Sequence, residues 1–434
     1  MRPSIGEPAP EQLRPVLDVV SDLAGGFAAA GRRLYLVGGV VRDLLLGSLT
    51  EVDDIDLTTD AVPAEVKRIT APHADDLWTQ GERFGTIGAM VDGRVVEITT
   101  HRAESYDATT RKPVVAFGHS IEADLSRRDF TINAMAIELP STRLIDPHGG
   151  RRDLAAGDLR TPLAPDIAFD DDPLRMMRAA RFIPRFGLRP DGALVTAATE
   201  RAARLDIVSV ERVHDELERL LAVPSPGPGV EFLAATGLLV HIVPALAGRA
   251  GAVEAAVTLA SAPGSSAVRR AGLVAAAGDA GPAALARLRY SRDDQHATLG
   301  LLAAVAVLAG GDDEAVRRAV DRVGLPAMAD VERLATNLRM LAPGVVDDPP
   351  PATVFDRYRS LARREDLTDL AAPLSGAEVM ELLGVPPGPV VGRAVAHLRH
   401  RRIVDGPTTP VEARRDLERW WLDEPDEKST DDSG

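Results

Sequence analysis

Two aspartates one residue apart are the first residues in this sequence whose types and spacing could do chemistry. Asp54 and Asp56 lie in "DIDLTT", a segment with the alternation of an extended strand. In a strand, residues i and i+2 face the same side, so the two carboxylates project together. Neighbouring carboxylates repel each other unless a proton or a cation lies between them. We predict Mg²⁺ here, because proteins bind it through one or two carboxylates together with substrate phosphates.

A glycine pair and an arginine precede these aspartates. Gly38 and Gly39 follow the apolar run "LYLV" and come before a helical pattern that contains Arg42. Glycines let a backbone approach a ligand closely, and a helix N-terminus offers free N–H groups to a phosphate. Arg42 adds a planar donor fork for phosphate oxygens. No G-K-[ST] follows, so the turn is not a P-loop. Each element alone is typical of an ordinary turn or a solvated strand edge, but together they favour a triphosphate site beside a metal site.

A second candidate group is "RRDFTINAMA", residues 127–136. Arginine neutralises phosphate and a carboxylate accepts from hydroxyl groups, so Arg127, Arg128 and Asp129 suit the sugar and phosphate end of a nucleotide. We place the three residues directly before a strand. The alternative is an arginine–aspartate pair on the surface.

A third candidate group is "DDDPLRMMRAARF", residues 170–182. Pro173 fits the first turn of a helix, with Asp172 or Asp171 near its cap. Arg175, Arg178 and Arg181 recur every three residues and therefore lie along one side of that helix. A solvated helix face is the alternative interpretation.

The elements that must position these residues change along the chain. Apolar spacing predicts an amphipathic helix over 11–30. Strand patterns then occur in "LYLVGG", "DIDLTT", "GTIGAMVDGRVVEITT" and "INAMAIELP", and the D-G pair inside the third indicates a hairpin. Beyond about residue 150, helical patterns dominate, as over 172–186, 192–204 and 209–223.

Composition limits the class of protein. The 434 residues include 45% hydrophobic but only 4% aromatic residues and no cysteine, which excludes disulfides and thiolate metal sites. No apolar run approaches membrane-spanning length and no signal peptide is evident, so we expect a soluble, cytoplasmic protein without a membrane partner. The net charge of −15 does not exclude nucleic acid, which needs only a local basic surface.

These motifs together resemble the class II tRNA nucleotidyltransferase and bacterial poly(A) polymerase family, within the polymerase-β-like nucleotidyltransferase superfamily. The resemblance rests on "LVGGVVRDLLLG" and "DIDLTTDA", then on the two later motifs above, and then on "VSVERVHDELERLL" at 208–221. It covers at least residues 34–221, and the segment 374–395 also resembles bacterial members.

The resemblance implies a role for each candidate residue. Asp54 and Asp56 become catalytic magnesium ligands, and Arg128 with Asp129 become nucleotide ligands. Asp172 and Arg175 match the pair that acts as a protein template for the incoming base. The carboxylate would accept from the amino group of C or A, while the arginine would donate to ring nitrogens or carbonyls. The remaining nucleotide-binding residues that we predict are Gly38, Gly39, Arg42, Arg178 and Arg181. Asp171 departs from the family, which usually has Glu there.

The predicted fold class is α+β: a nucleotidyltransferase head with a mixed sheet, followed by an all-α neck, body and tail. The expected boundaries are 1–148 for the head, 149–225 for the neck, 226–345 for the body, 346–422 for an RNA-binding tail and 423–434 for a disordered acidic end. The body shows no series of HD-hydrolase motifs. In the tail, Arg399, Arg401 and Arg402 form a basic segment that is either an RNA contact or a solvated helix end.

The predicted activity is metal-dependent addition of C, C and A to the 3′ end of tRNA from CTP and ATP, with no obligate protein partner. The polar segment 100–119 resembles the full-length flexible loop of CCA-adding relatives, which favours CCA or A addition over CC addition. An A-adding enzyme or a poly(A) polymerase of the same family is the nearest rival. A non-catalytic RNA-binding protein and a small-molecule nucleotidyltransferase are the others, but the D-x-D pair argues against the first and the long helical tail against the second.

Overall fold

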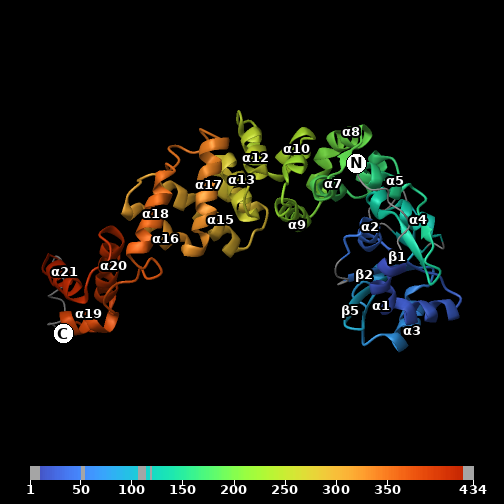
Figure 1. Ribbon diagram of the computed structural model, residues 1–434, viewed down its shortest axis with the longest axis horizontal. Helices are drawn as coiled ribbons and strands as arrows, with labels where there is room; N and C mark the ends of the chain where they lie inside the picture. Colours follow the sequence, from blue (N-terminus) through green and yellow to red (C-terminus); the bar gives the residue numbers. More distant parts are fainter. Residues whose placement is uncertain (1–9, 50–53, 106–113, 118–119, 424–434) are drawn as a thin grey trace, which may run out of the picture. The chain divides into compact units, whose positions relative to one another are not determined.

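A computed structural model describes residues 10–49, 54–105, 114–117 and 120–423, shown in Figure 1. The chain forms two compact units, residues 1–216 with 235–241 and residues 217–234 with 242–434. The predicted acidic end 423–434 lies almost wholly outside the described residues, as does the centre of the predicted loop 100–119. The finer boundaries at 148, 225 and 345 stay predictions.

The first unit is built on a seven-stranded mixed sheet with the order β3-β4-β5-β2-β1-β8-β9. Only the β2–β5 pair is parallel; the other neighbours are antiparallel. The strands are β1 (Leu34–Val37), β2 (Asp54–Thr59), β3 (Asp76–Trp78), β4 (Thr86–Val91), β5 (Arg94–Thr100), β8 (Ala136–Leu139) and β9 (Leu144–Ile145). β6 (Arg102–Ser105) pairs with β7 (Val114–Phe117), and β10 (Asp158–Leu159) with β11 (Arg189–Pro190).

The helices of the first unit pack on both faces of this sheet and extend beyond it. They are α1 (Pro10–Ala29), α2 (Gly39–Leu46), α3 (Pro63–Thr70), α4 (Ile121–Ser126), α5 (Gly150–Ala156), α6 (Pro165–Asp171), α7 (Leu174–Phe186), α8 (Gly192–Arg201) and α9 (Val210–Leu221), whose last residues belong to the second unit. α1 and α3 pack together beside the strands (Figure 1). Ile55 and Leu57 of β2 are buried on one side of the sheet, whereas Asp54 and Asp56 face the opposite side and are exposed. Ile121 and Leu125 lie against Tyr35 and Val37 on the face that also carries Asp56.

The hairpin that the D-G pair predicts is confirmed between β4 and β5. Asp92 and Gly93 both have positive φ, 48° and 71°, as a two-residue type I′ turn requires. The prediction that Arg127 to Asp129 directly precede a strand is wrong. Arg127 is the C-cap of α4, and β8 begins only at Ala136, because a short 3₁₀ turn over Thr131–Asn133 intervenes.

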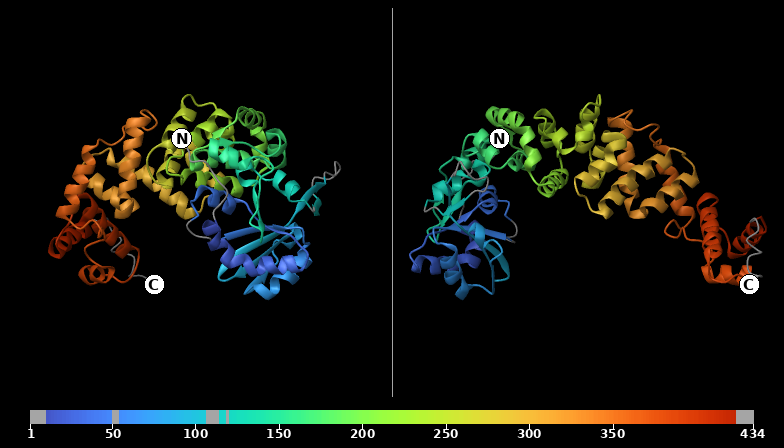
Figure 2. Two further views of the ribbon diagram at one scale, coloured as in Figure 1. Left: turned by 45° about the vertical axis from the view of Figure 1, so that its right-hand side comes forward. Right: turned by 180° about the vertical axis from the view of Figure 1, so that it is seen from behind.

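The second unit consists of helices joined by loops, with no strand among its described residues (Figure 2). Its helices are α10 (Gly227–Ala235), α11 (Leu238–Ile242), α12 (Ala252–Ser261), α13 (Ser266–Ala277), α14 (Gly281–Arg287), α15 (Arg292–Leu308), α16 (Asp313–Val323), α17 (Met328–Leu341), α18 (Thr353–Arg364), α19 (Gly376–Leu383), α20 (Pro389–Val404) and α21 (Pro410–Asp423), with α10 and α11 divided between the units. One apolar core joins α12, α13 and α15 to α18, and a smaller one joins α19 to α21. The predicted α+β class, with a mixed-sheet head before helices, is confirmed. None of the described helices is long and apolar enough to cross a membrane.

A buried charge cluster ties α16 to α20. Glu365 accepts from Arg317 at 2.9 Å and from Arg402 at 2.8 Å, and all three side chains are less than a tenth exposed. Arg402 also donates to the carbonyls of Asp366 and Asp369. The structure therefore does not support the predicted RNA contact for Arg402, since its donors face inward.

Replacing Glu365 by Ala should strongly destabilise the second unit, because two guanidinium groups would stay buried without a carboxylate. We expect a loss of about 3–5 kcal/mol in the free energy of unfolding, measured by urea unfolding. The matched control is Glu332→Ala, which removes an exposed ion pair with Arg359 and should cost less than about 1 kcal/mol. Equal losses for the two variants would contradict this assignment.

Candidate active site

The glycine turn brings the backbone against the aspartate strand. Gly38 has φ 78° and ψ −142° and is the N-cap of α2. A Cβ atom at this position would lie 3.2 Å from Oδ2 of Asp56 and 3.4 Å from Nη1 of Arg128. The positive φ favours glycine, and any side chain here would also crowd Asp56 and Arg128. The turn therefore places the N-terminus of α2 directly beside the carboxylate of Asp56.

A third carboxylate lies beside the two aspartates, on the neighbouring strand. Asp56 is in register with Glu97 of β5, and Asp54, Asp56 and Glu97 are all exposed on the same side of the sheet. Desolvation raises the pKa of Asp56 above its usual value; Arg128 opposes this effect and Asp54 adds to it. Desolvation and the two aspartates likewise raise the pKa of Glu97. The sequence analysis missed Glu97, although it is the one acidic residue in the run "RVVEITT".

These carboxylates fit a divalent cation that also binds a substrate. They supply hard oxygen donors, and their mutual repulsion in the protein alone favours a cation between them. In the part of the chain that the structure describes, no three His, Cys, Asp or Glu residues form a ready-made metal cage. Such an incomplete set suits Mg²⁺, which usually keeps waters and phosphate oxygens among its ligands.

Arg42 is fixed at the floor of the site. Its Nε and Nη2 donate to the two carboxylate oxygens of Asp43 at 2.8 and 2.9 Å, and its Nη1 donates to Oδ1 of Asn133 at 2.7 Å. The guanidinium lies 4.2 Å from the centre of the Phe186 ring. The residue is buried, and three of its five donors face protein acceptors. The orientation of the two remaining donors is thus set before a ligand arrives.

Asp129 is a buried anchor for Arg178. Its Oδ2 accepts from Nε and Nη2 of Arg178 at 2.9 and 2.6 Å, and its Oδ1 accepts from Asn133 at 3.0 Å. Burial alone would raise the pKa of Asp129, but the charge of Arg178 and these hydrogen bonds lower it below its usual value. Arg128 extends beside Gly38 and donates to Asp124 at 3.2 Å.

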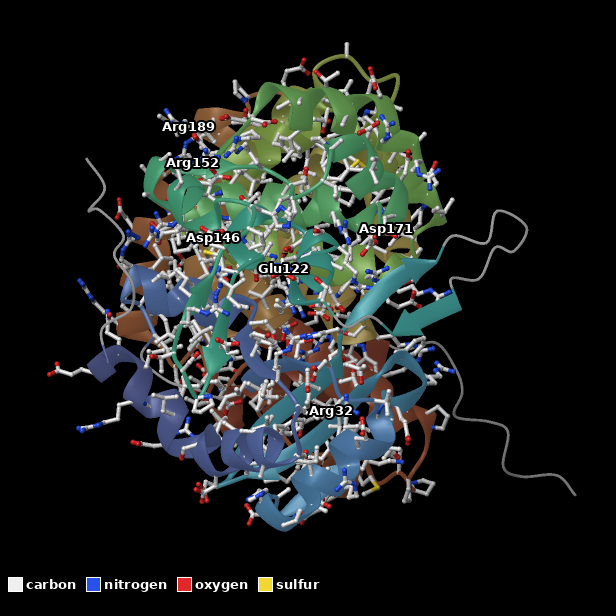
Figure 3. All side chains as sticks on the ribbon, turned by 90° about the vertical axis from the view of Figure 1, so that its right-hand side faces the viewer. Arg32, Glu122, Asp146, Arg152, Asp171 and Arg189 are labelled. Atoms are coloured by element: carbon white, nitrogen blue, oxygen red, sulfur yellow. The ribbon has the colours of Figure 1, made fainter. Side chains whose placement is uncertain are left out.

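The two residues that match the base-reading pair are both held by neighbours. Asp172 lies between α6 and α7, where its Oδ1 accepts from the N–H of Leu174 at 3.1 Å and its Oδ2 from Arg212 at 2.9 Å. Arg175 donates to the carbonyl of Arg127 at 2.6 Å and to Asp171 at 3.0 Å. Asp171, labelled in Figure 3, is the last residue of α6. The shorter carboxylate at this position therefore still reaches the arginine.

The third arginine of the row is buried in an ion pair. Arg181 donates through Nε to Oε2 of Glu216 at 2.6 Å, and Nη1 of Arg178 lies 3.6 Å from the other oxygen of Glu216. The side chains of Arg181 and Glu216 are 8% and 3% exposed. Glu216 thus holds Arg181 inside the protein, and Arg181 presents little charge to solvent.

One cleft of about 480 Å³ collects the predicted residues. Its lining includes all nine predicted nucleotide-binding residues together with Asp56; Asp54 lies two residues along β2 and is not part of the lining. Seven arginines line the cleft against three aspartates, so its interior is strongly positive and suits a polyphosphate. The lining residues that the sequence analysis did not assign to the site are Asn133, Leu174, Phe182, Arg185 and Arg212.

The predicted basic segment of the tail does not act as one group. Arg399 pairs with Asp321, and Arg401 pairs with Asp405 at 2.9 Å. Both arginine side chains are about half exposed, unlike that of Arg402. The RNA contact predicted for Arg399 and Arg401 stays a prediction.

Comparison with known families matches two regions of the chain. Residues 34–160 match the poly A polymerase head domain, and residues 187–248 match the probable RNA and SrmB-binding site of polymerase A. A CCA-adding enzyme of Geobacillus sp. (strain WCH70) is 40% identical over 213 residues, which is 49% of this chain and 51% of that protein. One from Geobacillus stearothermophilus is 40% identical over 222 residues, 50% of this chain and 52% of that protein. The chain thus spans about half the length of these relatives.

Solved structures match over more of the chain. The Bacillus stearothermophilus CCA-adding enzyme in complex with CTP has a TM-score of 0.74 and 27% identity, covering 95% of this chain and 98% of that one. The Thermotoga maritima CCA-adding enzyme complexed with tRNA has a TM-score of 0.66 at 21% identity, covering 96% and 97%, and shows that the fold is shared. Residues 34–160 and 187–248 are therefore similar to the head domain and to the probable RNA and SrmB-binding site of poly A polymerases, in line with the resemblance of the sequence motifs.

Proposed function

We propose that this protein is a metal-dependent RNA nucleotidyltransferase that adds C, C and A to the 3′ end of tRNA from CTP and ATP. The observation that carries this proposal is the single arginine-rich cleft that joins the glycine turn, Asp56 and the Asp172–Arg175 pair. The relatives named as CCA-adding enzymes, and the similar structure with CTP, support the same activity.

Different walls of the cleft bind different parts of the nucleotide. The turn at Gly38 and Gly39, the N-terminus of α2 and Arg42 face the triphosphate, where N–H groups and a guanidinium stabilise its charge. Arg128, with Asp129 behind it, lies where the ribose and phosphates meet. Arg178 and Arg181 complete this wall from α7.

Asp172 and Arg175 select the base. Asp172 accepts a hydrogen bond from the amino group of C or A, and Arg175 donates to the acceptors beside it. Because Arg212 and Asp171 hold these two side chains, the base meets a preformed pattern rather than two mobile side chains.

In the reaction, the RNA 3′ oxygen forms a bond to the α-phosphorus, and the bond from that phosphorus to its bridging oxygen breaks. Pyrophosphate leaves, and the hydroxyl proton passes to water. A divalent cation, held by Asp54 and Asp56 with Glu97 nearby, would acidify the hydroxyl and stabilise the leaving group. We infer Mg²⁺ for this role. Gly38 lets the carboxylate of Asp56 and the triphosphate share one small space.

The decisive assay incubates the protein with tRNA that ends at the discriminator base, with CTP and ATP singly and combined. We expect two additions with CTP alone and three with both nucleotides. Long tails from ATP alone would instead favour a poly(A) polymerase. No incorporation under any condition, with RNA binding intact, would leave a non-catalytic RNA-binding protein.

Asp56→Asn should abolish most nucleotide incorporation while leaving the fold intact, because the strand keeps its shape but loses a metal-binding charge. We expect a loss in kcat of at least about 100-fold, measured by single-turnover CTP incorporation. Asp92→Asn is the matched control, since it makes the same change in the turn of the same sheet, where asparagine tolerates the positive φ. Unchanged incorporation by Asp56→Asn would remove the proposed role of β2.

Asp172→Ala should weaken discrimination between nucleotides more than it slows the chemistry. Losing the carboxylate removes the acceptor for the amino group, so the preference for CTP over UTP should fall about tenfold or more, measured as the ratio of kcat/KM values. The control is Asp170→Ala, which removes a carboxylate that pairs with Arg201 and Arg204 outside the cleft. If the ratio fell equally in both variants, Asp172 would not read the base.

A further inference from the structure

A second cavity adjoins the nucleotide cleft at Asp56. It has a volume of about 280 Å³, and its lining includes Thr99, Asp124 and Arg127. It shares Asp56 and Arg128 with the nucleotide cleft, so the two spaces meet at the proposed metal-binding strand. Whatever occupies this cavity therefore lies next to the reacting atoms.

Two arginines of this cavity have donors that the protein does not use. Nε of Arg127 and Nε of Arg128 are shielded from solvent and have no hydrogen-bond partner among the described residues. Arg128 still pairs with Asp124 through Nη2, but the guanidinium of Arg127 pairs with no described carboxylate. Because these two Nε atoms are closed to solvent, ligand oxygens in the cavity would meet Arg127 through its outer guanidinium nitrogens.

The chemistry of in-line displacement narrows the identity of that ligand. The attacking hydroxyl must approach the α-phosphorus from the side opposite to the departing pyrophosphate. The nucleotide cleft contains the glycine turn and six of the arginines besides Arg128, so the triphosphate belongs there. The second cavity, which shares Asp56 and Arg128 with this cleft, is then left for the RNA strand that attacks.

We propose that this cavity is the subsite for the acceptor RNA, and that Arg127 binds the phosphodiester joining its last two nucleotides. This inference rests on the proposed function. A guanidinium fork suits phosphodiester oxygens, and its position beside Asp56 brings the terminal ribose to the metal-binding strand. Arg127 lies in this cavity and not in the lining of the nucleotide cleft, so its side chain serves the acceptor alone.

The backbone of the same residue reaches the base-reading pair. The carbonyl of Arg127 accepts from Nη2 of Arg175 at 2.6 Å. A side-chain substitution at Arg127 keeps this carbonyl. The acceptor contact can therefore be removed while the hydrogen bond to Arg175 stays in place.

The test compares native protein with Arg127→Ala, using an RNA hairpin whose last phosphodiester is natural or is an uncharged methylphosphonate. We expect Arg127→Ala to raise the KM for the natural hairpin about tenfold or more and to leave the KM for CTP within about twofold. The methylphosphonate should weaken the native protein similarly but add little further loss in the variant, because the two changes remove one contact. Fluorescence anisotropy of the hairpins without nucleotide or metal should show the same pattern.

Two further variants test whether the change in KM for RNA is an indirect effect of Arg127→Ala. Arg127→Lys keeps the charge and should recover part of the affinity for the natural hairpin. Arg143→Ala removes an exposed arginine of the same unit that pairs with Glu138, outside both cavities, and should change neither KM.

The outcomes separate this inference from the proposed function. An Arg127→Ala variant that raises the KM for CTP and not for RNA would assign the cavity to the triphosphate and overturn the inference. An equal methylphosphonate penalty in native protein and variant would overturn it too. If the native protein incorporates no nucleotide, the proposed function fails, and the anisotropy comparison still decides whether Arg127 binds the phosphodiester.

Discussion

Asp129 holds Arg178 in the wall of the cleft, and two further arginines of the cleft, Arg42 and Arg181, are connected to this contact. A row of hydrogen bonds runs through it: Arg42 to Asn133, Asn133 to Asp129, and Arg178 to Asp129. Glu216 continues the row by binding Arg181. A buried guanidinium is costly without a carboxylate, and several arginines side by side also repel each other. The carboxylates behind the wall therefore allow the cleft to present positive charge toward a ligand.

This arrangement separates two kinds of charge that would otherwise cancel. The exposed carboxylates of β2 and β5 lie on one side of the sheet, whereas the arginines come mainly from α7 and from the segment after α4. The two groups meet at Gly38, which has no side chain to hold them apart. A cation and a polyphosphate can therefore occupy neighbouring positions, each against charge of the opposite sign.

Sequence patterns could predict those parts of the site that depend on local periodicity. The i, i+2 rule places Asp54 and Asp56 on one side of β2, and three-residue spacing places Arg175, Arg178 and Arg181 along one wall of the cleft. Parts that depend on pairing between distant segments could not be predicted in this way. Glu97 joins Asp56 only through the register of β2 with β5.

The burial of Arg402 could not be predicted from the sequence for the same reason. The residue lies in a segment that looks solvated, yet its carboxylate partner is 37 residues away in the chain, at Glu365. The bonding of Asp129 to Arg178 spans 49 residues, and the motif around Asp129 gives no sign of this partner. The neighbours Arg127 and Arg128 show the finest division of this kind, because, of these two residues, Arg128 lines both cavities and Arg127 lines one. Two adjacent residues of identical type thus line different cavities, and this difference follows from the direction of each side chain rather than from the motif that contains them.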